Sequence, residues 1–313
     1  MEQRERKVYC IGEAIYDIIL KNGKPVDGKV GGALLNTAVS LGRCGIPVEY
    51  IGDTGEDSIG DLMKDFLLSN NVGVKHFISY PGSRSRLAVA FIDDINNPHY
   101  VFYKLNTPTP PKLSFPEVKK DDIIIFGSFF GIKEIIRSDL VAFLREARSR
   151  GALILYDPNF RVNHLPLLEE VRPYIIENME LAHITKGSND DFKLIFGTEN
   201  IRETMEKIEG QKPEFFLYTA NKHGIWYSLP GLQGHYAVDE IAPVSAIGAG
   251  DAFNAGLAYA LYSEDITVDN LKSKFVSSVE NILETADDFA VDVCLTFDNY
   301  VGEEIIEKYG LKP

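Results

Sequence analysis

The sequence predicts an α/β fold in which helices cover both faces of a mostly parallel β-sheet. Short apolar runs rich in β-branched residues alternate with longer amphipathic segments along most of the 313 residues. Parallel strands need long crossover connections, and the amphipathic segments supply these as helices. Two stretches break the alternation and show the pattern of antiparallel hairpins. By length alone, the chain can form one large α/β domain or two ordinary ones.

The first part of the chain already shows this alternation. A strand is expected over 7–12 and a helix over 33–44. Gly45 suits the end of that helix, because glycine adopts left-handed backbone angles freely. A strand over 48–52 and a helix over about 57–69 follow.

The alternation resumes in the second part of the chain. The expected strands are 121–127, 152–157, 180–185 and 214–219. The expected helices are 139–150, 168–178, 188–196 and a long one after Gly250. Together these elements predict a buried, mostly parallel sheet.

A small antiparallel β lid is expected from about 14–30 and 84–105. The first segment contains Asn22-Gly23, a strong signal for a tight hairpin, and the second holds two alternating strands around a polar loop. The proline-rich stretch 107–111 reads as a stiff connector back to the main body. Such an appendage acts as a lid over a site or as a homodimer surface; a simple packed edge is the alternative.

Composition excludes several classes of partner. The chain has 46 acidic against 32 basic residues, a formal net charge of −14 at pH 7, which disfavours nucleic acid and anionic membranes. Its three cysteines, Cys10, Cys44 and Cys294, lie far apart and form neither a metal motif nor a disulfide framework. The sequence contains no long apolar run. We therefore expect a reduced, cytoplasmic protein without a membrane segment.

The sharpest motif in the sequence is Gly-Ala-Gly-Asp at 248–251, directly before a helix of small and apolar residues. The free N–H groups and the dipole at a helix N-terminus bind anions, and glycines let phosphate oxygens approach the backbone. A carboxylate there would repel phosphate unless it takes part in chemistry, such as accepting a proton from an attacking hydroxyl. The alternative is that Asp251 simply caps the helix.

Two other phosphate-binding loops fit poorly. A dinucleotide-binding loop needs a third glycine near the first strand, whereas Phe253 fills that position late in the chain. A Walker loop is absent, because no Gly-Lys pair is followed by Ser or Thr.

The string GAGDAF at 248–253 resembles the signature of the ribokinase (PfkB) family of carbohydrate kinases. Four earlier strings agree with that family in order: Gly12-Glu13-Ala14 with Asp17, Gly31-Gly32-Ala33 with Asn36, 51–57 with Gly60, and Asp157-Pro158-Asn159-Phe160-Arg161. The last is typical of fructokinases and of 2-keto-3-deoxygluconate kinases. The resemblance covers essentially the whole chain and implies one ribokinase-like, three-layer α/β/α kinase domain over 1–313.

The resemblance also implies roles for individual residues. Asp251 would be the general base, with backbone donors from Gly248, Ala249 and Gly250. The substrate-binding candidates are Asp17, Gly31, Gly32, Asn36, Arg161 and Tyr103. The nucleotide-binding candidates are Lys186, Thr219, Asn221, Gly224 and Asn281. Asp191 would help to organise Mg²⁺ through water, and the cosubstrate would be ATP.

Several of these residues also have a purely structural alternative. Asp17 could be a solvated turn residue, Gly31-Gly32 a tight turn, and Arg161 a surface arginine. Tyr103 fits a solvated strand face at least as well as a contact with the sugar.

The chain departs from the family on the nucleotide and cation side. Ser245 stands where the family usually has an aspartate that binds a monovalent cation, so little dependence on such a cation is expected. Asn221 replaces a glycine of the nucleotide turn; asparagine tolerates left-handed angles better than most residues. The acidic segment 284–294 replaces a small-residue helix.

Three functions follow in order of preference. The first is an ATP-dependent sugar kinase, with fructose as the leading acceptor and 2-keto-3-deoxygluconate or another sugar as the alternative. The second is a non-catalytic sugar-binding or regulatory protein, suggested by the changes on the nucleotide side. The third, an oxidoreductase that binds a nicotinamide or a nucleotide sugar, lacks the N-terminal glycine motif.

Overall fold

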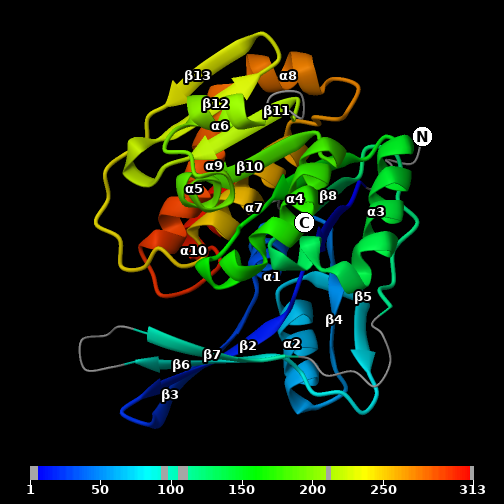
Figure 1. Cartoon of the computed structure of the whole chain (residues 1–313), viewed down its shortest axis with the longest axis vertical. Helices are drawn as coiled ribbons and strands as arrows, with labels where there is room; N and C mark the ends of the chain where they lie inside the picture. The colour runs from blue at the N-terminus through cyan, green and yellow to red at the C-terminus, as the bar shows by residue number, and fades with distance from the viewer. Residues whose placement is uncertain (1–5, 93–97, 105–111, 209–212, 311–313) are drawn as a thin grey trace.

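A nine-stranded sheet forms the centre of the part of the chain that the computed structural model describes, which is 6–92, 98–104, 112–208 and 213–310 (Figure 1). In spatial order its strands are β13 (Leu232–Tyr236), β12 (Ile225–Leu229), β11 (Phe215–Thr219), β10 (Ile184–Ser188), β9 (Leu153–Asp157), β8 (Ile123–Gly127), β1 (Val8–Ile11), β4 (Val48–Gly55) and β5 (Val72–Tyr80). The strands from β11 to β5 are parallel, and β12 and β13 add an antiparallel edge.

Helices cover both faces of this sheet. One face carries α1 (Ala33–Arg43), α2 (Ser58–Ser69), α7 (Ala249–Ser263), α8 (Leu271–Ser277), α9 (Val279–Cys294) and α10 (Glu303–Tyr309). The other carries α3 (Glu134–Ser149), α4 (Leu168–Leu181), α5 (Asn189–Phe196) and α6 (Ile201–Lys207). Short 3₁₀ turns lie at η1 (Phe129–Ile132), η2 (Val162–Leu167) and η3 (Asn221–His223).

The central strands bury both of their faces, as a parallel sheet between helix layers requires. In β1, Val8 and Cys10 join the core under α1 and α7, whereas Tyr9 and Ile11 join the core under α3 and α4. This arrangement confirms the predicted three-layer α/β/α fold.

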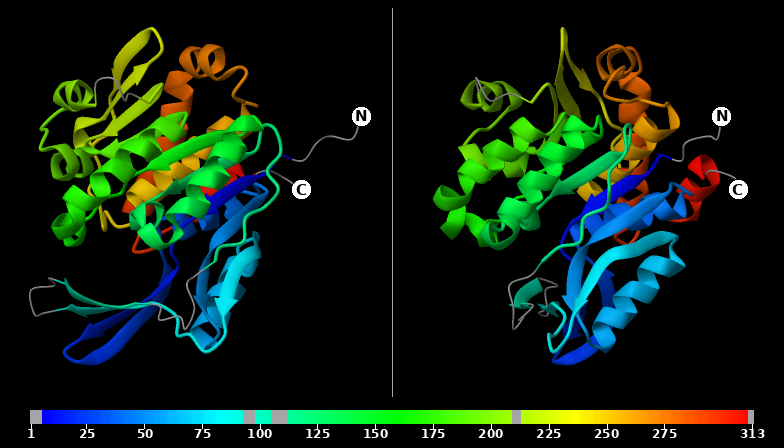
Figure 2. Two further views of the ribbon diagram at one scale, coloured as in Figure 1. Left: turned by 45° about the vertical axis from the view of Figure 1, so that its right-hand side comes forward. Right: turned by 90° about the vertical axis from the view of Figure 1, so that its right-hand side faces the viewer.

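A second, four-stranded sheet projects from the end of the molecule near β4 and α2 (Figures 1 and 2). Its order is β3 (Lys24–Gly31), β2 (Ile15–Lys21), β6 (Leu87–Ile92) and β7 (Pro98–Tyr103). Asn22 and Gly23 have φ of 53° and 72°, which closes the β2–β3 hairpin as predicted. Both hairpins are antiparallel, and the central pair β2–β6, which joins them, is parallel.

Some boundaries differ from the prediction. The expected strand at 180–185 was placed too early, because α4 continues to Leu181 and β10 begins at Ile184. A short apolar run cannot by itself separate the end of a buried helix from a buried strand. The proposed connector at 107–111 lies outside the described residues.

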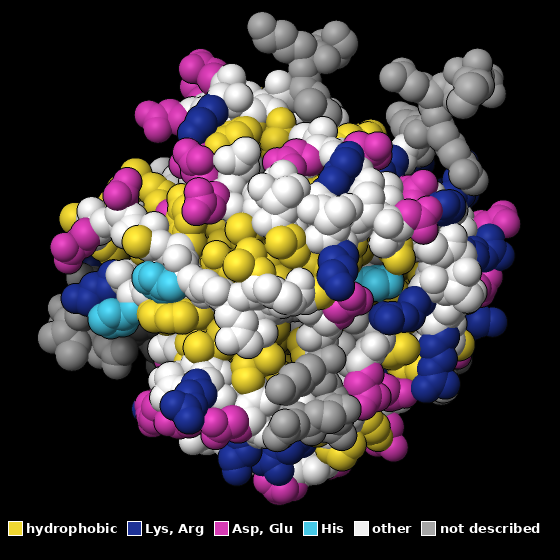
Figure 3. Space-filling view, turned by 90° about the horizontal axis from the view of Figure 1, so that it is seen from above, with side chains coloured by type: hydrophobic (Ala, Val, Ile, Leu, Met, Phe, Trp, Pro, Cys, Tyr) yellow, Lys and Arg dark blue, Asp and Glu magenta, His cyan; other side chains and the backbone are white. Residues whose placement is uncertain are grey.

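One end of the described chain exposes charged side chains of both signs together with apolar ones (Figure 3). Figure 3 shows the end of the molecule that carries β13 and α8, where basic and acidic side chains are interspersed among apolar ones. No helix in the described ranges is both long and apolar enough to cross a bilayer.

Candidate active site

The predicted motifs meet beside the carboxyl ends of β1 and β9. β1 lies between β4 and β8, so the chain leaves it toward one edge of the sheet and later returns on its other side. Ligands bind open α/β sheets in the crevice at such a reversal of strand order. The helices α1 and α7 pack against each other there, and both begin at this edge (Figure 1).

Asp251 lies in the first turn of α7, and no side chain caps the N-terminus of this helix. Gly248 is the N-cap with φ of 86°. The carboxylate of Asp251 accepts a hydrogen bond from Asn36 Nδ2 at 2.9 Å. Among the described residues, the Ala249 N–H has only a long bond of 3.5 Å to the backbone oxygen of Ala246, so this turn can still offer N–H groups to an anion.

Asp251 is a buried acid with a perturbed proton affinity. Its side chain is enclosed, with only 6% of the residue exposed. Burial raises the pKa of Asp251 to about 6; the Asn36 hydrogen bond and the charges of Arg161 and Lys186 oppose this shift, and Asp157 adds to it. A carboxylate with such a pKa is well matched to accepting a proton near neutral pH.

Helix α1 holds the motif from the other side. Asn36 is 4% exposed, and its Oδ1 has no hydrogen-bond partner among the described residues. Thr37 Oγ1 donates to the backbone oxygen of Asp251 at 2.9 Å, which ties α1 to α7. Because buried polar atoms are nearly always paired, the free Asn36 Oδ1 is an acceptor available to a ligand hydroxyl.

The Gly31-Gly32 pair brings bare backbone into this site. A side chain on Gly32, whose φ is 124°, would place its Cβ 2.1 Å from the backbone oxygen of Glu13. A Cβ on Gly31 would lie 2.9 Å from Asp17 Oδ2. Asp17 is half-buried, and this burial raises the pKa of its carboxyl to about 6.

Asn299 connects the Gly31 side of the site with the Asp251 turn. A Cβ on Gly248 would lie 2.9 Å from Asn299 Cα, and one on Gly31 would lie 3.9 Å from Asn299 Nδ2. Asp17, Gly31 and the start of α7 are therefore neighbours in space. Sequence reasoning did not single out Asn299, because nothing in its own stretch of sequence marks it.

Arg161 also belongs to this group. It is exposed, shortly after the end of β9, and its charge acts on both Asp251 and His164. Burial lowers the pKa of His164; Glu13 opposes the shift, and Lys133, Arg161 and Lys104 reinforce it. Lys104, at the end of the small sheet, is thus close enough to act on the same side chain.

A buried charge network, which sequence reasoning missed, joins the small sheet to the body. Arg86 pairs with Glu13 through Nε at 2.5 Å and with Asp53 through Nη2 at 2.7 Å. Lys133 also pairs with Glu13. Burial favours the neutral acid of Glu13, yet these two cations hold the pKa of its carboxyl below the ordinary value. Arg86 is therefore already paired with two carboxylates of the protein.

Tyr103 is 55% exposed at the end of β7, as a solvated strand face would be. The structure records no contact between Tyr103 and Asp251 or Asn36.

The predicted nucleotide residues are spread along one side of the sheet. Thr219 ends β11, and the following turn has Asn221 at φ of 48° and Gly224 at φ of 84°. Asparagine therefore does take a left-handed conformation there, as expected. Asn281 lies exposed on α9, and the structure shows no contact of its side chain with the other candidates among the described residues.

Lys186 differs from these candidates because it is buried. It is 4% exposed and forms an ion pair with Asp157 at 2.9 Å. Its amine lies beneath the Asp251 turn rather than at the surface.

Asp191 is largely used by the protein itself. Its Oδ2 accepts from the Ser188 N–H at 2.7 Å, and its own N–H donates to Ser188 Oγ at 3.1 Å, which together form the capping box of α5. The Ser188 hydroxyl also donates to the same Oδ2 at 2.6 Å. Asp191 Oδ1 accepts from the Phe160 N–H at 2.6 Å. In the described ranges no group of three His, Cys, Asp or Glu side chains could hold a metal. These contacts fit a role toward Mg²⁺ only through water.

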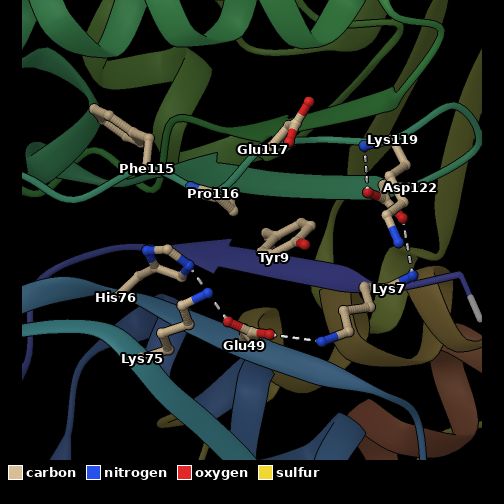
Figure 4. A pocket seen from close by; sticks show the side chains of 10 residues that line it. All are labelled: Lys7, Tyr9, Glu49, Lys75, His76, Phe115, Pro116, Glu117, Lys119 and Asp122. Carbon is tan, nitrogen blue, oxygen red and sulfur yellow. Dashed lines mark hydrogen bonds and ion pairs between the residues drawn. The ribbon is translucent and has the colours of Figure 1, made fainter.

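A cavity of about 360 Å³ lies at the opposite, amino-terminal edge of the strands (Figure 4). Tyr9 lies across the cavity. The carboxylate of Glu49, which lines the cavity, already pairs with Lys7 at 2.7 Å and with His76 at 3.6 Å. The cavity is separate from the Asp251 site, which lies at the other ends of the same strands.

Known structures share this architecture. A double mutant of the fructokinase of Vibrio cholerae O395, with fructose, ADP and potassium ion bound, aligns with a TM-score of 0.82 and 20% identity over 98% of this chain and 99% of that one. The aminoimidazole riboside kinase of Salmonella enterica, complexed with aminoimidazole riboside and an ATP analog, aligns with a TM-score of 0.80 and 20% identity over 97% and 99%. The architecture is thus the ribokinase-like fold.

Sequence comparison extends this result from fold to family. A probable fructokinase-6, chloroplastic, of Arabidopsis thaliana is 27% identical over 84% of this chain and 72% of its own length. A fructokinase of Vibrio alginolyticus is 23% identical over 82% and 84%. Residues 5–286 match the model of the pfkB family carbohydrate kinase. The protein is a phosphotransferase of the carbohydrate kinase class. It belongs to the pfkB family.

Proposed function

We propose that this chain, acting as one kinase domain over 1–313, phosphorylates fructose with ATP. The observation that carries the proposal is the pairing of a buried carboxylate, Asp251, with an uncapped helix N-terminus in the same turn. A kinase needs both groups side by side, because a hydroxyl must lose its proton as it attacks a phosphoryl group that gains charge.

The reaction follows from these positions. Asp251 accepts the proton of the attacking sugar hydroxyl, whose oxygen forms a bond to the γ-phosphorus of ATP while the bond to the β–γ bridging oxygen breaks. The backbone N–H groups of Gly248, Ala249 and Gly250 stabilise the charge on the transferred group. Mg²⁺ bound to ATP would supply charge neutralisation, and Asp191 would help to hold it through water. Thr219, Asn221 and Gly224 would hold the nucleotide.

The acceptor is expected to be a neutral ketohexose rather than a sugar acid. Asp17 and the free Oδ1 of Asn36 suit hydroxyl groups, and Asp17 repels a nearby carboxylate. Arg161 and Lys104 are the cations that favour the alternative, since a bound carboxylate needs matched positive charge.

The test is ADP release across hexoses, keto-acids and nucleosides under identical conditions. We expect kcat/KM for fructose to exceed that for 2-keto-3-deoxygluconate by about tenfold or more, roughly 1.4 kcal/mol. An Arg161→Gln variant indicates whether Arg161 serves the acid: it should reduce turnover of the acid more than that of fructose. A clear preference for the acid or for a nucleoside would rule out fructose as the acceptor.

The same assay separates catalysis from the non-catalytic alternative. If calorimetry detects a sugar bound to the protein and ADP release stays at background for every acceptor, the protein is a sugar-binding protein and the proposal is wrong.

Potassium is expected to change the rate by less than about twofold, because anionic oxygens dominate the affinity of hard-cation sites. Ser245 offers no carboxylate, and its hydroxyl already accepts a bond from the Ile247 N–H at 3.2 Å. Initial rates in potassium and in tetramethylammonium at equal ionic strength measure the effect. A Ser245→Asp variant should gain potassium dependence. Several-fold activation of the wild type would contradict this prediction.

A further inference from the structure

An ion pair lies buried directly beneath the Asp251 turn. Lys186, near the middle of β10, and Asp157, the last residue of β9, are 4% and 3% exposed, and Lys186 Nζ lies 2.9 Å from Asp157 Oδ2. Two ions without bulk water are costly to bury unless further hydrogen bonds satisfy them. The partners of this pair therefore indicate why it is there.

Each member of the pair contacts α7. Asn254 Nδ2, one turn after Asp251, donates to Asp157 Oδ2 at 2.6 Å. Lys186 Nζ lies 3.5 Å from the backbone oxygen of Gly250. A Cβ on Gly250 would lie 3.2 Å from the same Nζ atom. The same amine lies 5.7 Å from the centre of the Phe253 ring. The pair thus supports the first turn of α7 from below.

We propose that Lys186 and Asp157 are positioning residues that hold the Gly248–Asp251 turn, and with it the Asp251 carboxylate, in place. This inference rests on the proposed function, because it assumes that Asp251 is the base. It assigns Lys186 a role beneath the turn instead of a contact with the nucleotide. It also assigns a positioning role to Asp157, which had been named only as the first residue of the motif at 157–161.

The two members of the ion pair act on the pKa of Asp251 in opposite directions. Burial is the main cause of its raised pKa; Arg161 and Lys186 lower the pKa, whereas Asp157 raises it. Asn36 adds a neutral hydrogen bond from α1. Removing Lys186 should therefore raise the pKa of Asp251, and neutralising Asp157 should lower it.

The experiment compares Lys186→Met, Lys186→Arg, Asp157→Asn and the double variant Asp157→Asn/Lys186→Met with the wild type. Lys120→Met is the matched control, because Lys120 pairs with Asp269 at 2.5 Å on the surface at the other edge of the sheet. One readout is the kinetics with ATP and fructose as a function of pH. The other is independent of activity: a carbon-13 NMR titration of the Asp251 carboxyl, assigned with Asp251→Asn.

We expect Lys186→Met to lower kcat on the order of 10²-fold, because small displacements of a catalytic group are that costly. KM for ATP should stay nearly constant, and Lys186→Arg should recover part of the rate. The acidic limb of kcat should move to higher pH in Lys186→Met and to lower pH in Asp157→Asn, with the NMR midpoint of Asp251 following. The double variant removes both charges, so it should fold even if a single variant does not. Its midpoint should return toward the wild type while kcat stays low.

Three results would overturn the inference. A rise in KM for ATP with kcat retained would make Lys186 a nucleotide ligand. An Asp251 midpoint that moves in neither single variant, or a wild-type kcat in the double variant when the single ones unfold, would leave the pair a purely structural role. Equal loss of activity in Lys120→Met would show that the effect is not local. NMR shifts in the expected directions without kinase activity in the wild type would instead refute the proposed function alone.

Discussion

Asp251→Asn is expected to lower kcat by roughly 10²–10⁴-fold, the range for removing a positioned general base. The substitution is nearly isosteric, and an amide oxygen can still accept the bond that Asn36 Nδ2 now donates to the carboxylate at 2.9 Å. The residue is 6% exposed, and burial raises the pKa of its carboxyl to about 6, so the neutral amide removes an unfavourably buried charge. The variant should therefore fold at least as well as the wild type and still bind ATP.

The measurement is kcat and KM for both substrates at pH 8, with thermal melting as a check on folding. Asp65→Asn, an exposed aspartate on α2, is the control and should retain full activity. Near wild-type turnover by Asp251→Asn would mean that another group takes the proton.

Gly32→Ala is expected to disrupt the sugar side of the site. At φ of 124° any side chain is strained, and the new Cβ would lie 2.1 Å from the backbone oxygen of Glu13. Backbone strain of this kind costs on the order of 1–3 kcal/mol. The clash can be relieved only by moving one of two segments. One is the chain just before β2, the strand that carries Asp17. The other is the start of α1, the helix that carries Asn36. Both movements displace a candidate sugar ligand, so kcat/KM for the sugar should fall about 10- to 100-fold.

Calorimetric binding of fructose and steady-state kinetics measure this effect. Gly82→Ala is a matched control, because Gly82 also has a positive φ, 72°, but a Cβ there would meet nothing within 4 Å. It should melt somewhat earlier and keep its kinetics. A Gly32→Ala variant with unchanged fructose affinity would show that this backbone does not border the sugar.

The layered fold was predictable because each element has a local signature. Strand residues that face both cores are continuously apolar, and a helix that covers a sheet is amphipathic, so the two kinds of segment can be recognised without knowing their partners. Local patterns failed where two elements meet without a turn signal. In the run at 180–185, apolar residues lie on both sides of the junction between α4 and β10, and the boundary depends on which neighbour each residue packs against.

The candidate site divides in the same way. Gly248–Asp251 could be recognised from sequence, because a helix N-terminus with glycines and a carboxylate is contained within a few residues. Contacts between segments far apart along the chain could not be recognised from sequence. The hydrogen bond from Asn36 to Asp251 spans 215 positions, and the approach of Asn299 to both Gly31 and Gly248 has no counterpart in any local pattern.

By itself, the sequence determined that this chain forms a layered α/β protein with an anion-binding turn, a nearby carboxylate and bare glycine backbone, since these depend on residue types at short spacing. Only the tertiary structure decided which charged side chains are already paired and buried within the protein. Lys186 and Arg86 are ordinary cations in the sequence, yet in the fold each is buried against a carboxylate that lies close in space but far along the chain. Burial and pairing, which set the proton affinity and the availability of a charged group, arise from long-range packing and are therefore not encoded in any single segment.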